Sequence, residues 1–149
     1  MKKLMLGLLM LGLVATGCAR KQEVVVDIRN DMRVAAVEQI NKSMIFFDFD
    51  RFDIKPDYYD VLKQNAGLIK EYKLKVQIAG HADERGTSEY NLALGAQRAM
   101  AARDFMVILG VDVNQIDLIS YGKEKPLFEG RGEQYWSKNR RDEFRVLKK

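Results

Sequence analysis

The 149-residue sequence has little of the chemistry that builds disulfides and zinc sites, since it contains one cysteine and one histidine. A single cysteine cannot form an internal disulfide, and one cysteine with one histidine gives no basis for a Cys/His zinc site. The net charge is only +4, from 25 basic and 21 acidic residues. This weak excess gives little reason to expect a nucleic-acid partner, and we expect none.

The N-terminal apolar run is too short to cross a bilayer. Leu4–Val14 covers eleven residues, whereas a spanning helix needs about 20. The run follows Lys2 and Lys3 and is followed by the small residues 15–17. This order of basic, apolar and small residues is typical of a secretory signal. We therefore expect residues 1–17 to be a cleaved signal peptide rather than a permanent transmembrane helix.

The only cysteine, Cys18, directly follows these small residues. The stretch Ala15-Thr16-Gly17-Cys18 resembles the lipobox of bacterial lipoproteins, with Ala15 where that class usually has leucine. The resemblance implies cleavage before Cys18 and acylation of this cysteine, and several acyl chains together make a stable membrane anchor. Ala19, rather than aspartate, follows the cysteine, which by the usual sorting rule implies the outer membrane. A plain signal peptide with an incidental cysteine is the alternative.

About 130 residues remain after the signal, enough for one compact domain. Their charge is nearly balanced, because loss of Lys2 and Lys3 leaves 23 basic residues against 21 acidic ones. We expect residues 18–40 to form the acylated N-terminus and a tether, with a short helix over residues 32–41, where apolar residues recur at helical spacing. The folded domain is expected over residues 41–149.

Hydrophobic periodicity predicts alternating strands and helices in that domain. Strands are expected over residues 44–50, 74–78, 116–121 and 143–147, and helices over residues 56–72 and 87–109. The strands alternate apolar and polar residues, so one face of the sheet should be wet. Right-handed crossovers would place both helices on the same side. We therefore expect an α/β (α+β) fold, a two-layer β-α-β-α-β-β sandwich with a mixed four-stranded sheet and helices on one face.

The helix predicted over residues 87–109 carries two distinct stripes. The stripe expected to face the core consists of Leu92, Ala96, Ala99, Met106 and Leu109. Asn91, Leu94 and Arg98 fall together on a different sector. This second stripe begins near the loop that precedes the helix, so Arg98 is expected to lie outside the core stripe and close to that loop.

The densest cluster of unusual residues is the loop Gly80–Thr87, with the sequence GHADERGT. Together with Asn91, Leu94-Gly95 and Arg98-Ala99, it resembles the signature of the OmpA-like peptidoglycan-binding domain family. Further segments that continue the resemblance, which spans roughly residues 40–149, are Phe49–Ile54, Ser120–Pro126 and Asn139–Arg141. Within this family the chain is most similar to the lipoproteins of Tol–Pal systems.

The resemblance implies a domain that binds the diaminopimelate side of the peptidoglycan stem peptide. That end of the ligand carries an ammonium and a carboxylate. Asp83 would accept the ammonium, and Arg98 would hold the carboxylate through its planar fork. Such a pair selects a zwitterion, because a ligand lacking either charge leaves one partner unpaired. The other pocket positions implied by the resemblance are Phe49, Asp50, Arg85, Asn91 and Leu94, the last as an apolar wall.

The resemblance also implies an environment and partners. The domain would lie in the periplasm, held at the outer membrane by lipid, and would contact peptidoglycan and Tol proteins of the TolB and TolA type. No cofactor is expected beyond the covalent lipid on Cys18. A protein-interaction adaptor from the same family is the alternative function.

A cell-wall hydrolase is a less favoured alternative. Asp83 and Glu84 are adjacent in the sequence, whereas the paired carboxylates of glycosidases face each other across a substrate. The sole histidine, His81, has no partner cysteine, and we expect it to be a hydrogen-bonded loop residue. We therefore expect no enzymatic activity.

Several residues also have plainer interpretations. The Asp83 loop could be an ordinary solvated loop, and Arg98 could form a surface ion pair of little energetic value. The aromatic residues Phe46, Phe47 and Phe52 are expected in the core. Arg140 and Arg141 are expected to begin the last strand, with a role in solvation and packing at the sheet edge.

Overall fold

A computed structural model describes the backbone of residues 17–148 and the side chains of residue 25 and residues 27–148. The predicted signal peptide, residues 1–17, lies outside the described residues except for Gly17, and the side chain of Cys18 is likewise outside them. Within residues 17–148, no helix has the length and apolar character needed to cross a membrane.

The first helix, α1, runs from Gly17 to Lys42. It is longer than the predicted helix over residues 32–41, because it also includes the residues predicted as a tether. Near its C-terminal end, Ala36 and Ile40 are 3% and 0% exposed, and Ile40 belongs to the hydrophobic core. The compact domain takes in residues from Arg33 onward. The tether was predicted over residues 18–40, and its last residues, 33–40, are therefore part of the folded domain.

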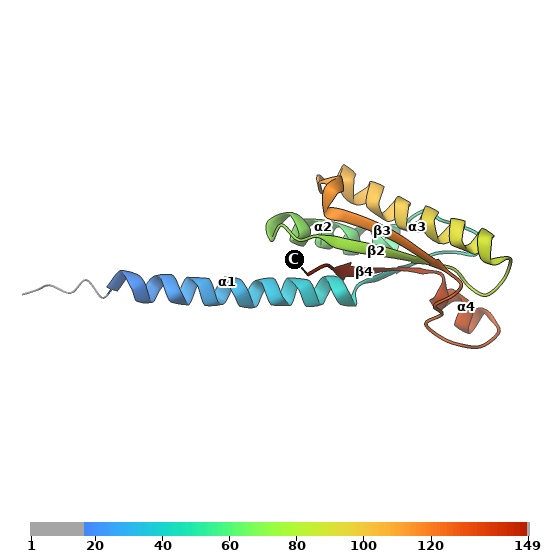
Figure 1. The fold of residues 1–149 in the computed structure, drawn as a ribbon, viewed down its shortest axis with the longest axis horizontal. Coiled ribbons are helices and arrows are strands. Elements are labelled where there is room, and N and C mark those ends of the chain that lie inside the picture. Colours follow the sequence, from blue (N-terminus) through green and yellow to red (C-terminus); the bar gives the residue numbers. More distant parts are fainter. Residues whose placement is uncertain (1–16, 149) are drawn as a thin grey trace, which may run out of the picture. The chain divides into compact units, whose positions relative to one another are not determined.

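Four strands form one mixed sheet in the order β1-β4-β2-β3. Figure 1 labels three of them, β4, β2 and β3, side by side. The strands are β1 (Met44–Phe46), β2 (Val76–His81), β3 (Ile116–Gly122) and β4 (Arg141–Val146). β2 and β3 are parallel, and β4 is antiparallel to both of its neighbours. A parallel pair needs a long crossover connection, and the helix between β2 and β3 provides it. The predicted mixed four-stranded sheet is confirmed.

Two helices pack on the same face of the sheet, as predicted. They are α2 (Tyr59–Glu71), which follows a 3-10 turn at Pro56–Tyr58, and α3 (Ser88–Ile108). The core between sheet and helices includes Val76 and Ile78 of β2, Leu62 and Ile69 of α2, and Ala99 and Met106 of α3. On the opposite face Gln77 and Glu143 are half-buried and Arg145 is exposed, so that face is partly wet.

β1 is shorter than the predicted strand over residues 44–50. After Phe46 the backbone carbonyls bond arginine side chains instead of a neighbouring strand: Phe47 accepts from Arg140, and Asp48 accepts from Arg98. Asp50 then adopts a positive φ of 56°, which turns the chain away from the sheet. Phe47 is buried as predicted, but Phe52 is 47% exposed, so its assignment to the core is wrong.

The C-terminal part contains a helix that the sequence patterns do not predict. α4 covers Glu133–Asn139, between β3 and β4. It is only two turns long, too short for a clear hydrophobic period. A 3-10 turn at Val113–Gln115 also precedes β3. β4 begins at Arg141, two residues before the predicted range 143–147 but in agreement with the expectation that Arg141 begins the last strand. Arg140 alone joins α4 to β4.

Candidate binding site at the Asp83 loop

The buried side of α3 differs from the one that its apolar residues predict. Ala99 and Met106 are buried as expected, but Leu92 is 50% exposed, whereas Asn91 is 2% and Arg98 0% exposed. The prediction that Leu92 faces the core is therefore wrong. Arg98 is buried, but it lies beside the Asp83 loop together with Asn91 and Leu94, as predicted. Both polar residues are buried because they donate hydrogen bonds to backbone carbonyls, which offsets the cost of removing them from water.

Two close contacts fix the start of α3 beside the end of β2. The Thr87 hydroxyl accepts a hydrogen bond from the backbone N–H of Tyr90 (3.2 Å) and so caps the start of the helix. The Asn91 side chain donates to the carbonyl of Arg85 (2.8 Å) and so holds the preceding loop against the helix. Asn91 thus orders the loop in addition to lining the cavity described next.

The Asp83 loop, α3 and the segment after β1 enclose a cavity of about 180 Å³. All seven binding residues predicted from the resemblance line it: Phe49, Asp50, Asp83, Arg85, Asn91, Leu94 and Arg98. Gly86, Tyr90 and Arg140 complete the lining. The fold therefore brings residues from four parts of the chain into one cavity: the segment after β1, the Asp83 loop, α3 and Arg140 after α4.

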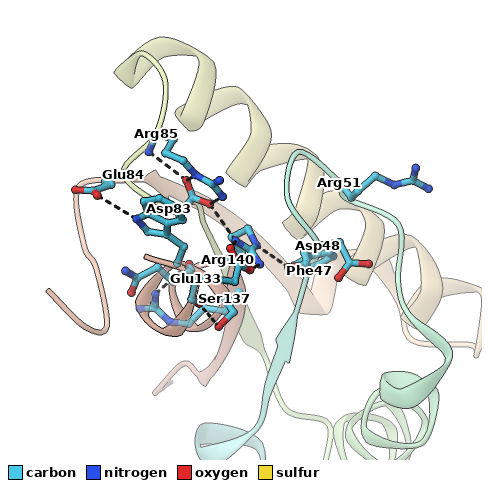
Figure 2. Close-up of polar contacts among 12 residues, drawn as sticks. Phe47, Asp48, Arg51, Asp83, Glu84, Arg85, Glu133, Ser137 and Arg140 are labelled. Carbon is cyan, nitrogen blue, oxygen red and sulfur yellow. Dashed lines mark hydrogen bonds and ion pairs between the residues drawn. The ribbon is translucent and has the colours of Figure 1, made fainter. Parts of the chain in front are cut away.

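Asp83 lies at the centre of a cluster of charged hydrogen bonds (Figure 2). Its Oδ1 accepts from the backbone N–H (3.1 Å) and Nε (3.0 Å) of Arg85, and its Oδ2 accepts from Arg85 Nη2 (2.6 Å) and Arg140 Nη1 (3.2 Å). Burial alone would raise the pKa of Asp83, but the hydrogen bonds from Arg85 and Arg140 outweigh it and hold the pKa below the ordinary value of 3.8. Asp83 is therefore a carboxylate at neutral pH.

Arg98 supplies a buried positive charge to the same cavity. Its guanidinium donates to three backbone carbonyls, those of Arg51 (2.8 Å), His81 (2.7 Å) and Asp48 (3.2 Å). A guanidinium has five N–H groups, so two remain for a ligand. Burial lowers the pKa of Arg98 to about 10, which leaves it protonated at neutral pH.

Arg85 is held between two aromatic rings at the rim of the cavity. The central carbon of its guanidinium lies 3.8 Å from the ring centroid of Phe49 and 4.1 Å from that of Trp136. Trp136 in turn donates through Nε1 to Glu84 (3.0 Å), the contact drawn beside Glu84 in Figure 2. Phe49 is 56% exposed, so it belongs to the rim of the cavity and not to the core.

Arg140 is the main residue of this site that the sequence analysis missed. It is 5% exposed, donates to the Phe47 carbonyl (2.9 Å) and to Asp83, and forms an ion pair with Glu133 of α4. Its expected role at the sheet edge is therefore wrong. The one available signal was its place in the motif Asn139–Arg141, which carries the resemblance but does not say that Arg140 reaches Asp83.

His81 does not belong to this cavity. It is the last residue of β2 and is 2% exposed, and neither ring nitrogen has a well-aligned hydrogen-bond partner in the described part of the chain. The expectation of a hydrogen-bonded loop residue is therefore wrong.

Metal ligands were a separate question for this site. No group of three or more His, Cys, Asp or Glu residues suited to a metal ion occurs within the described residues.

Comparison with known proteins gives consistent matches. Residues 46–140 match the model of the OmpA family. A peptidoglycan-associated lipoprotein of Pseudomonas aeruginosa is 44% identical over 100 residues, which cover 67% of this chain and 60% of that protein. The peptidoglycan-associated lipoprotein of Pasteurella multocida is 37% identical over 146 residues, which cover 95% of this chain and 97% of that protein.

Solved structures agree with these sequence matches. The crystal structure of the peptidoglycan-associated lipoprotein from Burkholderia pseudomallei has 41% sequence identity and a TM-score of 0.71, and the match covers 73% of this chain and 93% of that one. The predicted resemblance and the predicted fold class are confirmed.

Proposed function

Because this chain belongs to the OmpA family, we propose that it is an outer-membrane lipoprotein that binds peptidoglycan non-covalently through the diaminopimelate-containing stem peptide. Its kinship to peptidoglycan-associated lipoproteins supports this proposal. The lipid on Cys18 would hold one end at the membrane, and the domain in the periplasm would hold the cell wall. Such a link belongs to a Tol–Pal-like system that maintains the envelope during cell division, with TolB and TolA-type proteins as partners.

One observation carries the proposal: a single small cavity is lined by a buried carboxylate and a buried guanidinium. The diaminopimelate end of a stem peptide offers the complementary ammonium and carboxylate. Its ammonium would bind Asp83, where the Arg85 guanidinium now donates, and its carboxylate would bind the remaining N–H groups of Arg98. Leu94, 7% exposed in the cavity wall, would contact the methylene groups between them.

Co-sedimentation with purified peptidoglycan tests this assignment. Asp83→Asn keeps the size of the side chain and removes its charge, and it should weaken binding at least tenfold, because a charged hydrogen bond is worth roughly 1.5–3 kcal/mol. Arg98→Lys should weaken binding similarly, because lysine lacks the planar fork. Lysine is preferred to alanine here, since alanine would also remove three structural hydrogen bonds. Circular dichroism checks the fold of each variant.

Matched substitutions on α3 outside the cavity serve as controls, one at exposed Glu89 and one at half-buried Arg103. Glu89→Gln and Arg103→Lys change similar groups outside the cavity and should sediment like the unmodified protein. Full binding by both Asp83→Asn and Arg98→Lys would exclude the site. Release of soluble muropeptides during the assay would instead favour the hydrolase alternative.

Comparison of two peptidoglycan types tests recognition of a zwitterion. Peptidoglycan with lysine in place of diaminopimelate keeps the ammonium but lacks the carboxylate that Arg98 would bind. We expect clearly weaker sedimentation with the lysine type, since the buried guanidinium would be left without its partner. Equal binding to both types would show that Arg98 does not read a ligand carboxylate.

A further inference from the structure

We propose that a second cavity, on the face of the sheet opposite α2 and α3, binds an acidic peptide segment of a protein partner. The cavity measures about 460 Å³ and shares no lining residue with the Asp83 cavity. The inference does not depend on peptidoglycan binding, because it rests on different residues and on a different face of the domain.

Alternation along the central strands places this cavity. In β2, Val76 and Ile78 point into the core, so Gln77, Ala79 and His81 point to the other face, where they line the cavity. Arg141, Glu143 and Arg145 of β4 lie beside them in the antiparallel register. The ends of β3 and the following loop contribute Tyr121, Lys125 and Pro126.

The cavity carries an unbalanced positive charge. Its one carboxylate, Glu143, already accepts a hydrogen bond from Arg141 Nε (2.8 Å), so these two charges compensate each other. Lys125 and Arg145 remain, both exposed, and neither forms an ion pair with a carboxylate among residues 27–148. The Lys125 ammonium lies 3.7 Å from the ring centroid of Tyr121, which holds it over the cavity wall. An anionic ligand would complete this arrangement.

The side chain of His81 gives an independent sign of a ligand. It is 98% buried, and its ring nitrogens lack well-aligned partners; Nε2 lies 3.9 Å from Glu143, too far for a hydrogen bond, and the Lys125 carbonyl is nearby. Burial, reinforced by the charge of Arg141, lowers the pKa of His81 to about 4. The ring is therefore neutral at pH 7, and an incoming carboxylate would compete with the Lys125 carbonyl for its one N–H donor. Buried polar groups without partners are rare in native proteins.

The remaining lining favours a peptide over a small anion. The Gln77 amide offers a donor and an acceptor, which match the N–H and C=O groups of a peptide backbone. Tyr121 and Pro126 offer apolar surface, and the volume exceeds that of a single carboxylate. An aspartate or glutamate side chain could thus reach His81 and Lys125 while its backbone lies along Gln77.

Fluorescence anisotropy on the full mature chain tests this proposal. The probe is a fluorescein-labelled Gly-Glu-Asp-Glu-Gly amide, and its matched analogue is Gly-Gln-Asn-Gln-Gly amide. We expect the acidic probe to bind at least tenfold more tightly. Lys125→Gln and Arg145→Gln should each weaken its binding severalfold, whereas Lys63→Gln, exposed on α2, should not. Lys125→Gln should also sediment with peptidoglycan like the unmodified protein, so the two sites can fail separately.

A substitution at His81 tests the buried nitrogens directly. His81→Phe keeps an aromatic ring and removes the N–H donor. It should therefore weaken binding of the acidic probe without lowering the free energy of unfolding. Backbone ¹H–¹⁵N spectra with the acidic probe should shift residues 77–81 and 141–145. Equal affinity for both probes, an equal loss in Lys63→Gln, or shifts confined to the Asp83 loop would overturn the proposal.

Discussion

Three arginines organise the candidate binding site at the scale of single residues. Arg98 and Arg140 are 0% and 5% exposed, and Arg85 lies half-buried beside Asp83. Each donates through several N–H groups at once: Arg98 to backbone carbonyls, Arg85 to the Asp83 carboxylate, and Arg140 to both kinds of acceptor. A planar guanidinium can do this, whereas a lysine ammonium on a flexible stem cannot match the same set of acceptors. The cavity therefore depends on the geometry of these side chains as well as on their charge.

Asp142 is a buried carboxylate that the proposed functions do not use. It is 0% exposed in β4, and neither carboxylate oxygen is hydrogen-bonded within the described part of the chain. Burial raises its pKa well above 3.8, although the charges of Arg98 and Arg141 act in the opposite direction. The folded state therefore binds this proton more tightly than the unfolded state, so stability is lost as the pH rises above about 3.8.

We predict that Asp142→Asn stabilises the protein at neutral pH. The neutral amide avoids the cost of ionising a buried group, so the free energy of unfolding should rise by about 1–3 kcal/mol at pH 7. The gain should shrink towards pH 4, where the wild-type carboxyl is protonated. Urea unfolding over this pH range measures it, with exposed Asp27→Asn as control. A gain that does not change with pH would show that ionisation is not the cause.

At the scale of elements, the contact between β2 and α3 sets the position of Arg98. Gly80 and Gly95 face each other so closely that a Cβ built on Gly80 would lie 1.8 Å from the Gly95 carbonyl oxygen. This approach lets the Arg98 side chain reach the His81 carbonyl across the end of the strand. Both glycines belong to the motifs that carry the family resemblance, and their role here is to allow close packing.

We predict that Gly80→Ala destabilises the protein by about 3 kcal/mol or more, because backbone atoms cannot move aside as a flexible side chain would. Gly67→Ala is the matched control. Gly67 occupies an exposed position of α2, with nothing within 4 Å of the added Cβ. This substitution should raise the free energy of unfolding by about 0.5–1 kcal/mol. Thermal and urea unfolding measure both variants. Similar behaviour of the two would show that strand and helix can separate without cost.

At the scale of the whole molecule, the proposed function needs two separate attachments. One is the lipid on Cys18, and the other is the cavity around Asp83 in the domain that starts near Arg33. The proposed peptide cavity would add a third attachment on the opposite face of the sheet. These attachments should be separable by mutation, because they share no residues.

We predict that Cys18→Ala moves the protein from the outer-membrane fraction to the soluble periplasmic fraction. The variant lacks the acyl chains that anchor the protein. Residues 17–148 also contain no helix suited to cross a membrane. The purified variant should still sediment with peptidoglycan like the unmodified protein. Mass spectrometry of the N-terminal peptide from the protein without this substitution should show an acylated cysteine. Retention of the variant in the membrane fraction would show that another part of the chain provides the anchor.

The sequence by itself determined the class of the fold and most members of the candidate site, with Arg140 as the main exception. Local periodicity is enough to predict α2, α3 and all four strands, because residues one period apart in a helix or strand share its buried or its exposed face. The family resemblance, carried by several separate segments, implied seven residues that do line one cavity. The strand ends and α4 were not predicted correctly. Short segments show little periodicity, and their structure depends on contacts with residues far away in the sequence.

Only the tertiary structure decided how those residues are used. Arg98 is buried because carbonyls 17 to 50 residues away accept its hydrogen bonds, and Arg140 reaches Asp83 across 57 residues. His81 and Asp142 are buried without such partners. The burial of a polar group depends on acceptors and donors that the fold brings from elsewhere, and residue spacing along one helix or strand contains no information about them.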